Sequence, residues 1–158
     1  MTTEDEIEEI EAMVRRNIET HGQHIWSVTV AEGDPPGSLA FCYTVGNHGR
    51  GLPELMITGP IASSFGPVLN MLSKIQRERG NGFEHGELVN LGGKYPVRIL
   101  DAGDAGRTEW ATYVGNYYDT EDFEVRQVLI CDPNGRWPGD PECAEGFRAQ
   151  LIVNNNIN

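Results

Sequence analysis

The sequence has few cysteines, no long apolar run and no basic leader, and each shortage argues against a class of protein. Its three cysteines are an odd number and form no Cys-x-x-Cys pair, so we expect no secreted disulfide framework and predict a cytoplasmic location. No segment approaches the roughly 18 consecutive apolar residues that a membrane-spanning helix needs. The N-terminus is acidic and does not resemble a secretory signal, so no membrane association is predicted.

Basic residues are also scarce. Lys and Arg number 12 against 24 Asp and Glu, which gives a formal net charge of −12 at pH 7. A field of this sign repels phosphate, so we expect no direct nucleic-acid binding. The same charge permits mimicry of DNA, although its density over a whole domain is far below that of a duplex and is explained more simply by solubility.

Common catalytic signatures are missing. The 19 glycines form neither a G-x-G-x-x-G nor a P-loop pattern, and there is no G-x-S-x-G. His21 and His24 have metal-like spacing but lack further ligands nearby, so no metal site is predicted and no cofactor is indicated. A nucleophile pair of Cys42 with His48 or His85 is conceivable, yet Cys42 lies in an apolar segment typical of a buried thiol. Whether the protein is an enzyme stays open, with the balance against catalysis.

The chain opens with a predicted acidic helix over residues 1–20. Thr3 and Glu6 have capping-box spacing, and Gly22 is a suitable C-terminal stop. The apolar stripe of this helix consists of Ile7, Ile10, Val14 and Ile18. Its acidic residues suit the positive end of the helix dipole, and they also permit the helix to dock on a partner.

The rest of the chain mixes predicted strands and helices. Strands are expected over residues 24–31, 39–45, 54–58, 95–99, 123–131 and 147–153, with a weak strand or loop over 83–91. A second helix is expected after a cap near Ser63 or Ser64, and a third over residues 108–118. We therefore predict one α+β domain, 1–158, with a mixed or mostly antiparallel sheet packed by about three helices and a frayed tail at 154–158.

Two features of the C-terminal third stand out. Gln127 shares a predicted strand face with apolar residues, so its amide either ties the sheet to a loop or faces a ligand. The loop over 132–140 contains the turn signal Asn134-Gly135 and a large aromatic residue, Trp137. That tryptophan either plugs the edge of the core or lines a pocket.

Several short segments form a recognisable combination by their order and spacing. They are Phe41-Cys42-Tyr43-Thr44-Val45-Gly46, Pro53-Glu54-Leu55, Leu69-Asn70, Gln127 with Asp132-Pro133-Asn134-Gly135-Arg136-Trp137-Pro138, and Gln150-Leu151. Together, over residues 22–152, they resemble the bacterial domain-of-unknown-function family 4262. The resemblance implies a small bacterial or phage protein and no named activity. Leu52 stands where members often have His, so no His-dependent chemistry is implied for this chain.

These observations support more than one hypothesis. The first is a protein-binding module, similar to an immunity or inhibitor protein, with a basic protein as partner. The second is a small-molecule site or enzyme near the motif segments, with Glu54 as a base and Arg136 holding an anion. DNA mimicry is a third. The candidate binding residues are Tyr43, Thr44, Gly46, Glu54, Asn70, Gln127, Asp132, Arg136 and Trp137. Tyr43 also fits a core aromatic residue, and Glu54 a carboxylate on the surface or bracing a loop.

Overall fold

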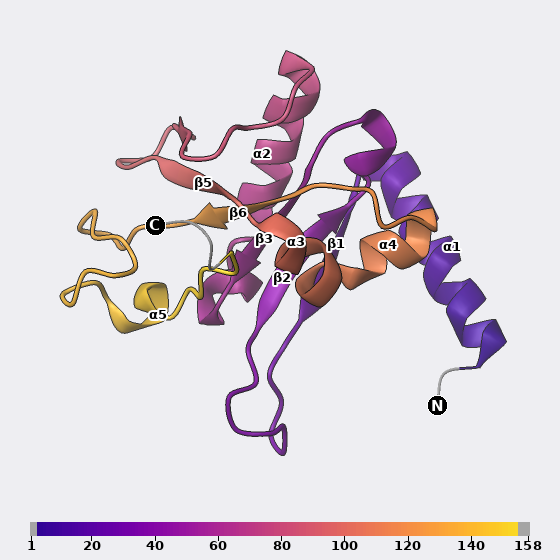
Figure 1. The fold of residues 1–158 in the computed structure, drawn as a ribbon, viewed down its shortest axis with the longest axis horizontal. Coiled ribbons are helices and arrows are strands. Elements are labelled where there is room, and N and C mark those ends of the chain that lie inside the picture. Colours follow the sequence, from indigo (N-terminus) through magenta and orange to yellow (C-terminus); the bar gives the residue numbers. More distant parts are fainter. Residues whose placement is uncertain (1–2, 155–158) are drawn as a thin grey trace.

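A mixed sheet organises the computed structural model, which describes residues 3–154 (Figure 1). Six strands lie in the order β1-β2-β3-β6-β5-β4. Their bounds are β1 His24–Val28, β2 Phe41–Val45, β3 Glu54–Thr58, β4 Leu88–Val89, β5 Val97–Asp101 and β6 Val125–Leu129. All neighbours are antiparallel except the central pair β3–β6, in which Glu54 lies opposite Val125. The α+β prediction with a mostly antiparallel, mixed sheet is confirmed.

Both faces of the sheet carry a hydrophobic core. On one face, Leu55 and Ile57 of β3 pack with Leu69 and Leu72 of α2, which spans Gly66–Arg79. On the other, Met56 belongs to the cluster that contains residues of α1 and α4. Successive side chains of a strand point to opposite faces, and every residue of β3 is buried. The continuous apolar run in β3 is therefore the mark of a central strand covered on both sides.

The first helix, α1 (Glu4–His21), follows its local signals closely. The Thr3–Glu6 capping box is formed, and Gly22 ends the helix in the left-handed region at φ 89°. Val14 is fully buried, whereas Ile7, on the same stripe, is 52% exposed. The stripe therefore meets the core from Ile10 onward, whereas Ile7 lies outside it. The first turns extend beyond α4 at the edge of the molecule (Figure 1).

The predicted cap of the second helix is wrong. Pro60–Ser63 forms a 3₁₀ turn, and Ser64 donates its N–H to the Ile61 carbonyl at 2.9 Å. Ser64 is thereby held at a helical φ of −95° and ψ of −17°, outside the extended conformation of a capping residue. The residue that precedes α2 is Phe65, without a side-chain cap, and the proline of the first turn is tolerated as expected.

The third predicted helix, over 108–118, is in fact divided between a π-helical segment (Gly106–Trp110) and α4 (Thr112–Tyr118). A short helix, α3 (Gly103–Ala105), comes directly before them. A Cβ at Gly106 would lie 2.4 Å from the Cβ of Ala102, so only glycine permits this close approach to the preceding turn. The N–H of Ala111 donates to the Gly106 carbonyl at 2.8 Å, which closes the wider π turn.

The predicted final strand, over 147–153, is also wrong. The chain forms a short helix, α5 (Glu145–Arg148), and then runs without regular structure beside β6. Side-chain amides rather than a backbone ladder hold it there, since Gln150 bonds both the N–H and the carbonyl of Ile130. Of the predicted frayed tail, Asn154 donates to the Asp101 carbonyl at 3.1 Å, and 155–158 lie outside the described residues. Within 3–154, no helix has both the length and the apolar character to cross a membrane.

Candidate functional site

A buried carboxylate organises the end of the sheet at which β3 begins. Glu54 has no exposed surface and accepts four hydrogen bonds. Its Oε1 receives the Thr44 hydroxyl at 2.7 Å and the N–H of Asn47 at 3.0 Å. Its Oε2 receives the N–H groups of Gly46 and His48, both at 3.0 Å. The loop that follows β2 is thus wrapped around one carboxylate.

The surroundings of this carboxylate favour a structural role. Burial raises the pKa of Glu54 to about 7, against the opposing effect of its hydrogen-bond donors. The side chain is fully buried and three of its four hydrogen bonds come from backbone N–H groups of one loop, so the loop-bracing interpretation fits better than that of a base. Tyr43 is likewise buried; its hydroxyl accepts the Tyr113 N–H at 3.1 Å, and burial raises its pKa to about 12.

A network of polar side chains extends from this carboxylate to α2. Asn47 donates from Nδ2 to the Ser73 hydroxyl at 2.9 Å, and Gln23 donates from Nε2 to Asn70 Oδ1 at 2.7 Å. We call this group the polar junction; its members are Gln23, Thr44, Asn47, Glu54, Asn70 and Ser73. Four candidate residues of the sequence analysis therefore meet here or bound it, namely Thr44, Gly46, Glu54 and Asn70.

Gln127 belongs to a different part of the molecule. Its Nε2 donates to the Leu151 carbonyl at 2.6 Å and to the Thr58 hydroxyl at 3.2 Å, and its Oε1 accepts the Val153 N–H at 3.0 Å. The side chain is buried and its amide oxygen and nitrogen both bond within the chain. This arrangement matches the interpretation of an amide that ties the sheet to another segment.

The loop after β6 is built around Asp132. Its carboxylate accepts the N–H groups of Asn134, Arg136 and Ala144, each at 2.9 Å. These hydrogen bonds, that from Arg136 first, hold the pKa of Asp132 below its ordinary value of 3.8. Trp137 is half-buried, with the guanidinium of Arg98 4.6 Å from the centre of its ring. The loop is therefore ordered by its own carboxylate and covers one end of β5 and β6.

The two groups of candidate residues lie at opposite ends of the sheet. Glu54 is opposite Val125 in the parallel pair, and Asp132 follows seven residues further along the chain. The strand from Val125 to Leu129 spans about 13 Å at 3.3 Å per residue, and Asp132 lies beyond its end. A single pocket that joins Tyr43 and Glu54 to Arg136 and Trp137 is therefore not formed, because β3 and β6 run in the same direction.

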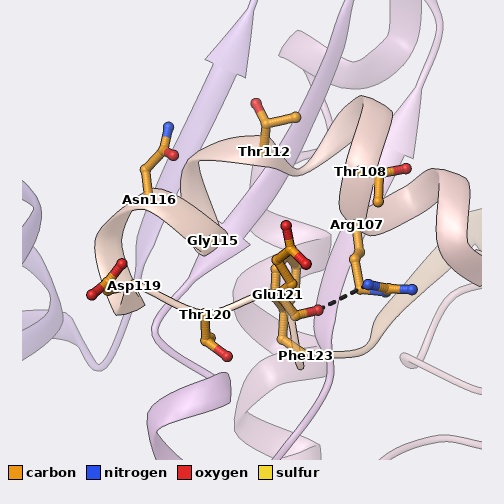
Figure 2. Close-up of a pocket in the computed structure, with 9 residues that line it drawn as sticks. All are labelled: Arg107, Thr108, Thr112, Gly115, Asn116, Asp119, Thr120, Glu121 and Phe123. Atoms are coloured by element: carbon orange, nitrogen blue, oxygen red, sulfur yellow. Dashed lines mark hydrogen bonds between the residues drawn. The ribbon is translucent and has the colours of Figure 1, made fainter.

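The sequence analysis missed a polar hollow on the α3–α4 side of the molecule (Figure 2). It has a volume of about 530 Å³ and is lined by Arg107, Thr108, Thr112, Gly115, Asn116, Asp119, Thr120, Glu121 and Phe123. Arg107 donates to the Glu121 carbonyl at 2.9 Å across it. Asp119 is the one non-glycine residue with positive φ, 52°, in the described part of the chain. The closely spaced Gly103 and Gly106 were the available signal of an irregular helix.

The protein is thus an α+β protein with a mixed sheet. The buried polar junction lies at one end of the sheet, and the loop ordered by Asp132 lies at the other. The chain belongs to a family described as a domain of unknown function (DUF4262), whose family model matches residues 17–144. Searches of curated proteins and of solved structures found no match. Over residues 3–154, no cluster of three or more His, Cys, Asp or Glu side chains is placed to hold a metal ion.

Proposed function

We propose that the protein is a cytoplasmic binding module, similar in action to an immunity or inhibitor protein, that recognises a basic protein through the first half of α1. The supporting observation is the exposure of Ile7 and Met13, at 52% and 39%, within a strongly acidic segment. We call residues 4–13 the α1 arm. Its carboxylates are those of Glu4, Asp5, Glu6, Glu8, Glu9 and Glu11.

Helix electrostatics explains only part of this arrangement. Glu4, Asp5 and Glu6 lie in the first turn, where negative charge stabilises a helix. The dipole gives no reason for Ile7 to continue the apolar stripe beyond the covered part of the helix. Among the arm's carboxylates, within the described chain, Glu11 alone forms an ion pair, and its partner is Arg15 of the same helix at 3.1 Å.

A basic partner suits this combination. Exposed carboxylates steer the approach of a positively charged surface, and apolar side chains at the centre of a contact supply most of the affinity. Association should therefore weaken as salt is added, since screening acts on the steering charges. The buried, free state of Cys42, Cys131 and Cys143 supports the assignment to a reducing cytoplasm, and the family resemblance supports a bacterial or phage source.

The test is site-specific photo-cross-linking in extract of the source cells. A photo-reactive residue is placed at Ile7 and, as a control, at Leu88, which is equally exposed at 54% on the edge strand β4. We expect a salt-sensitive cross-link to a basic protein from position 7 and none from position 88. Equal yields from both positions would contradict the proposal.

Charge variants add a matched comparison. The double variant Glu8→Gln, Glu9→Gln removes two charges from the arm, and Glu109→Gln, Glu145→Gln removes two exposed charges elsewhere. We expect the first pair to reduce cross-linking and the second to leave it unchanged. If the partner binds DNA and duplex DNA competes for it, the arm acts as a DNA mimic, which is the alternative hypothesis.

A further inference from the structure

Three buried polar atoms lie without a protein partner around the polar junction. Within residues 3–154 they are the only buried side-chain nitrogen or oxygen atoms that lack a hydrogen bond: Gln23 Oε1, Asn47 Oδ1 and Arg77 Nη1. Gln23 is 4% exposed and Asn47 is fully buried. More than about 90% of buried polar groups in proteins are hydrogen-bonded. Their gathering where α1 ends, β2 ends and α2 passes indicates a place that receives a polar ligand.

Two arginines meet at the same place. Arg77 Nη1 and Arg50 Nη2 lie 2.7 and 3.4 Å from the position that a Cβ on Gly22 would occupy. Arg50 is held there, because it donates to the Gly22 carbonyl at 2.6 Å and to the Gly46 carbonyl at 3.4 Å. The two guanidinium groups therefore lie close together.

The charge of this arginine pair is not neutralised by a direct contact. Although the chain has 24 acidic and 12 basic residues, none of its carboxylates within 3–154 lies at ion-pair distance from Arg50 or Arg77. Burial, and then the charge of Arg50, lower the pKa of Arg77, while Glu78 offsets part of this effect. Adjacent like charges repel, so an anion bound between them would be stabilised.

We propose that Gln23, Asn47, Arg50 and Arg77 form a binding site for a phosphate group, either free or carried by a small phosphomonoester. The guanidinium forks donate to the phosphate oxygens. Inorganic phosphate keeps at least one P–OH near neutral pH, and a phosphomonoester keeps one below its second pKa of about 6. This hydroxyl donates to one of the two amide oxygens. Sulfate carries no such proton and would leave the amide oxygens unpaired, so the site should select phosphate.

The polar junction positions these groups. The side-chain oxygen of Asn70, in α2, accepts a hydrogen bond from Gln23 Nε2. The other atom of the Gln23 amide, Oε1, is thereby directed away from Asn70 and has no hydrogen-bond partner in the chain. Asn47 donates to Ser73, which orients Asn47 Oδ1 in the same way. Three of the motif segments that carry the family resemblance, 41–46, 53–55 and 69–70, thus lie at the polar junction beside the proposed site. The proposed site also lies at the other end of α1 from Ile7 of the α1 arm, about 22 Å away at 1.5 Å per residue, so the two proposals stand or fall separately.

A purely structural role for the arginines explains less. The carbonyl groups at a helix C-terminus carry partial negative charge, and the bond from Arg50 to Gly22 fits this role. It does not account for the unpartnered Nη1 of Arg77, nor for the two amide oxygens.

The experiment is a titration of the full chain with inorganic phosphate, followed through the side-chain Nε–H resonances of its arginines by NMR. Sodium sulfate at equal ionic strength is the comparison. We expect saturable shifts of Arg50 and Arg77 but not of Arg148, and at least about tenfold weaker binding of sulfate, because one buried hydrogen bond to a charged group is lost. Absence of a saturable shift, or equal binding of sulfate, would overturn the proposal.

Variants test the assignment. We expect Arg77→Gln to weaken phosphate binding at least about tenfold and the control Arg148→Gln to leave it unchanged. Phosphate should raise the melting temperature of the wild type and not that of Arg77→Gln. If Arg77→Gln fails to fold, Arg50→Lys keeps the charge and loses the fork, and unaltered binding by that variant would count against the site. Glycerol 3-phosphate as a second probe distinguishes the sources: tighter binding than inorganic phosphate indicates an ester, weaker binding the free ion.

Discussion

The hydroxyl of Thr44 donates to the Glu54 carboxylate at 2.7 Å and accepts the backbone N–H of Leu55 at 3.0 Å. The Thr44 hydroxyl oxygen thus links the end of β2 to the side chain of Glu54 and to the backbone of Leu55, both in β3. Since β2 and β3 pair directly only from Phe41 to Tyr43, this side chain replaces the ladder where the strands separate. The polar junction begins at this oxygen.

Replacement of that hydroxyl by a methyl group should destabilise the fold. In Thr44→Val the shape is kept, but the buried N–H of Leu55 and one lone pair of Glu54 lose their partner. We expect the free energy of unfolding to fall by about 2–3 kcal/mol. Urea denaturation measures it. Thr29→Val, at an exposed position, serves as the control and should change stability by less than about 0.5 kcal/mol.

The raised pKa of Glu54 predicts a specific dependence of stability on pH. The folded protein keeps this proton up to about pH 7, whereas the unfolded chain releases it near the ordinary value of 4.5. The folded state then binds more protons, so the free energy of unfolding decreases as the pH rises from 4.5 to 7. The full loss is about 3 kcal/mol.

Glu54→Gln isolates this contribution from the general repulsion of an acidic chain. The variant has no proton to release at this position, so its stability should fall less steeply over the same pH range. Denaturant unfolding of both proteins at several pH values gives the two slopes. Parallel slopes would mean that Glu54 does not titrate in this range.

Gln127 should hold the C-terminal segment on the sheet. In Gln127→Leu the Val153 N–H loses its partner and the Leu151 carbonyl keeps only the Thr58 hydroxyl, at a cost of about 1–3 kcal/mol in the free energy of unfolding. Hydrogen exchange checks the mechanism, since protection should be lost first at Val153 while β3 keeps its protection. Uniform loss across the sheet would instead indicate damage to the core.

Asp132 should order the loop that carries Trp137. Asp132→Asn places an amide NH₂ where a carboxylate oxygen accepts N–H groups, so amide exchange at Arg136 and Ala144 should accelerate. The wild-type loop should loosen in the same way as the pH falls below 3.8, because a carboxylate with a depressed pKa loses its contribution on protonation. Asp122→Asn, at an exposed position, should leave both amides unchanged.

Local signals made the first part of the chain predictable. The capping box at Thr3 and the glycine at 22 act within one turn of the helix, so α1 begins after the expected cap and ends before the expected glycine. The strand at 54–58 was predicted with its exact length, because its apolar run lies between breaking residues. The amide of Gln127 was expected to find partners because it lies among apolar residues, and it bonds to Thr58, Leu151 and Val153.

Tertiary contacts explain what was missed. The segment at 147–153 has the apolar residues of a strand, but its backbone is satisfied instead by the side chains of Gln127, from β6, and of Gln150, within the segment itself. The candidate residues divide into two groups because β3 and β6 are parallel, and a pattern of apolar residues contains no information on strand direction. The arginine pair was missed since Arg50 and Arg77 come together only when α2 packs beside the loop after β2.

The parallel seam between β3 and β6 also bears on how the chain reaches this structure. β1, β2 and β3 are successive hairpin partners, and β4, β5 and β6 form a second antiparallel set from the later part of the chain. Within each set, the paired strands follow one another along the chain, so a single loop brings each pair together. The β3–β6 pair instead joins Glu54, in the first half of the chain, to Val125, in the last quarter. During synthesis the first set leaves the ribosome with the β3 edge unpaired, and it must remain so until β6 is made. The slow step of folding should be the docking of two small preformed sheets along this edge.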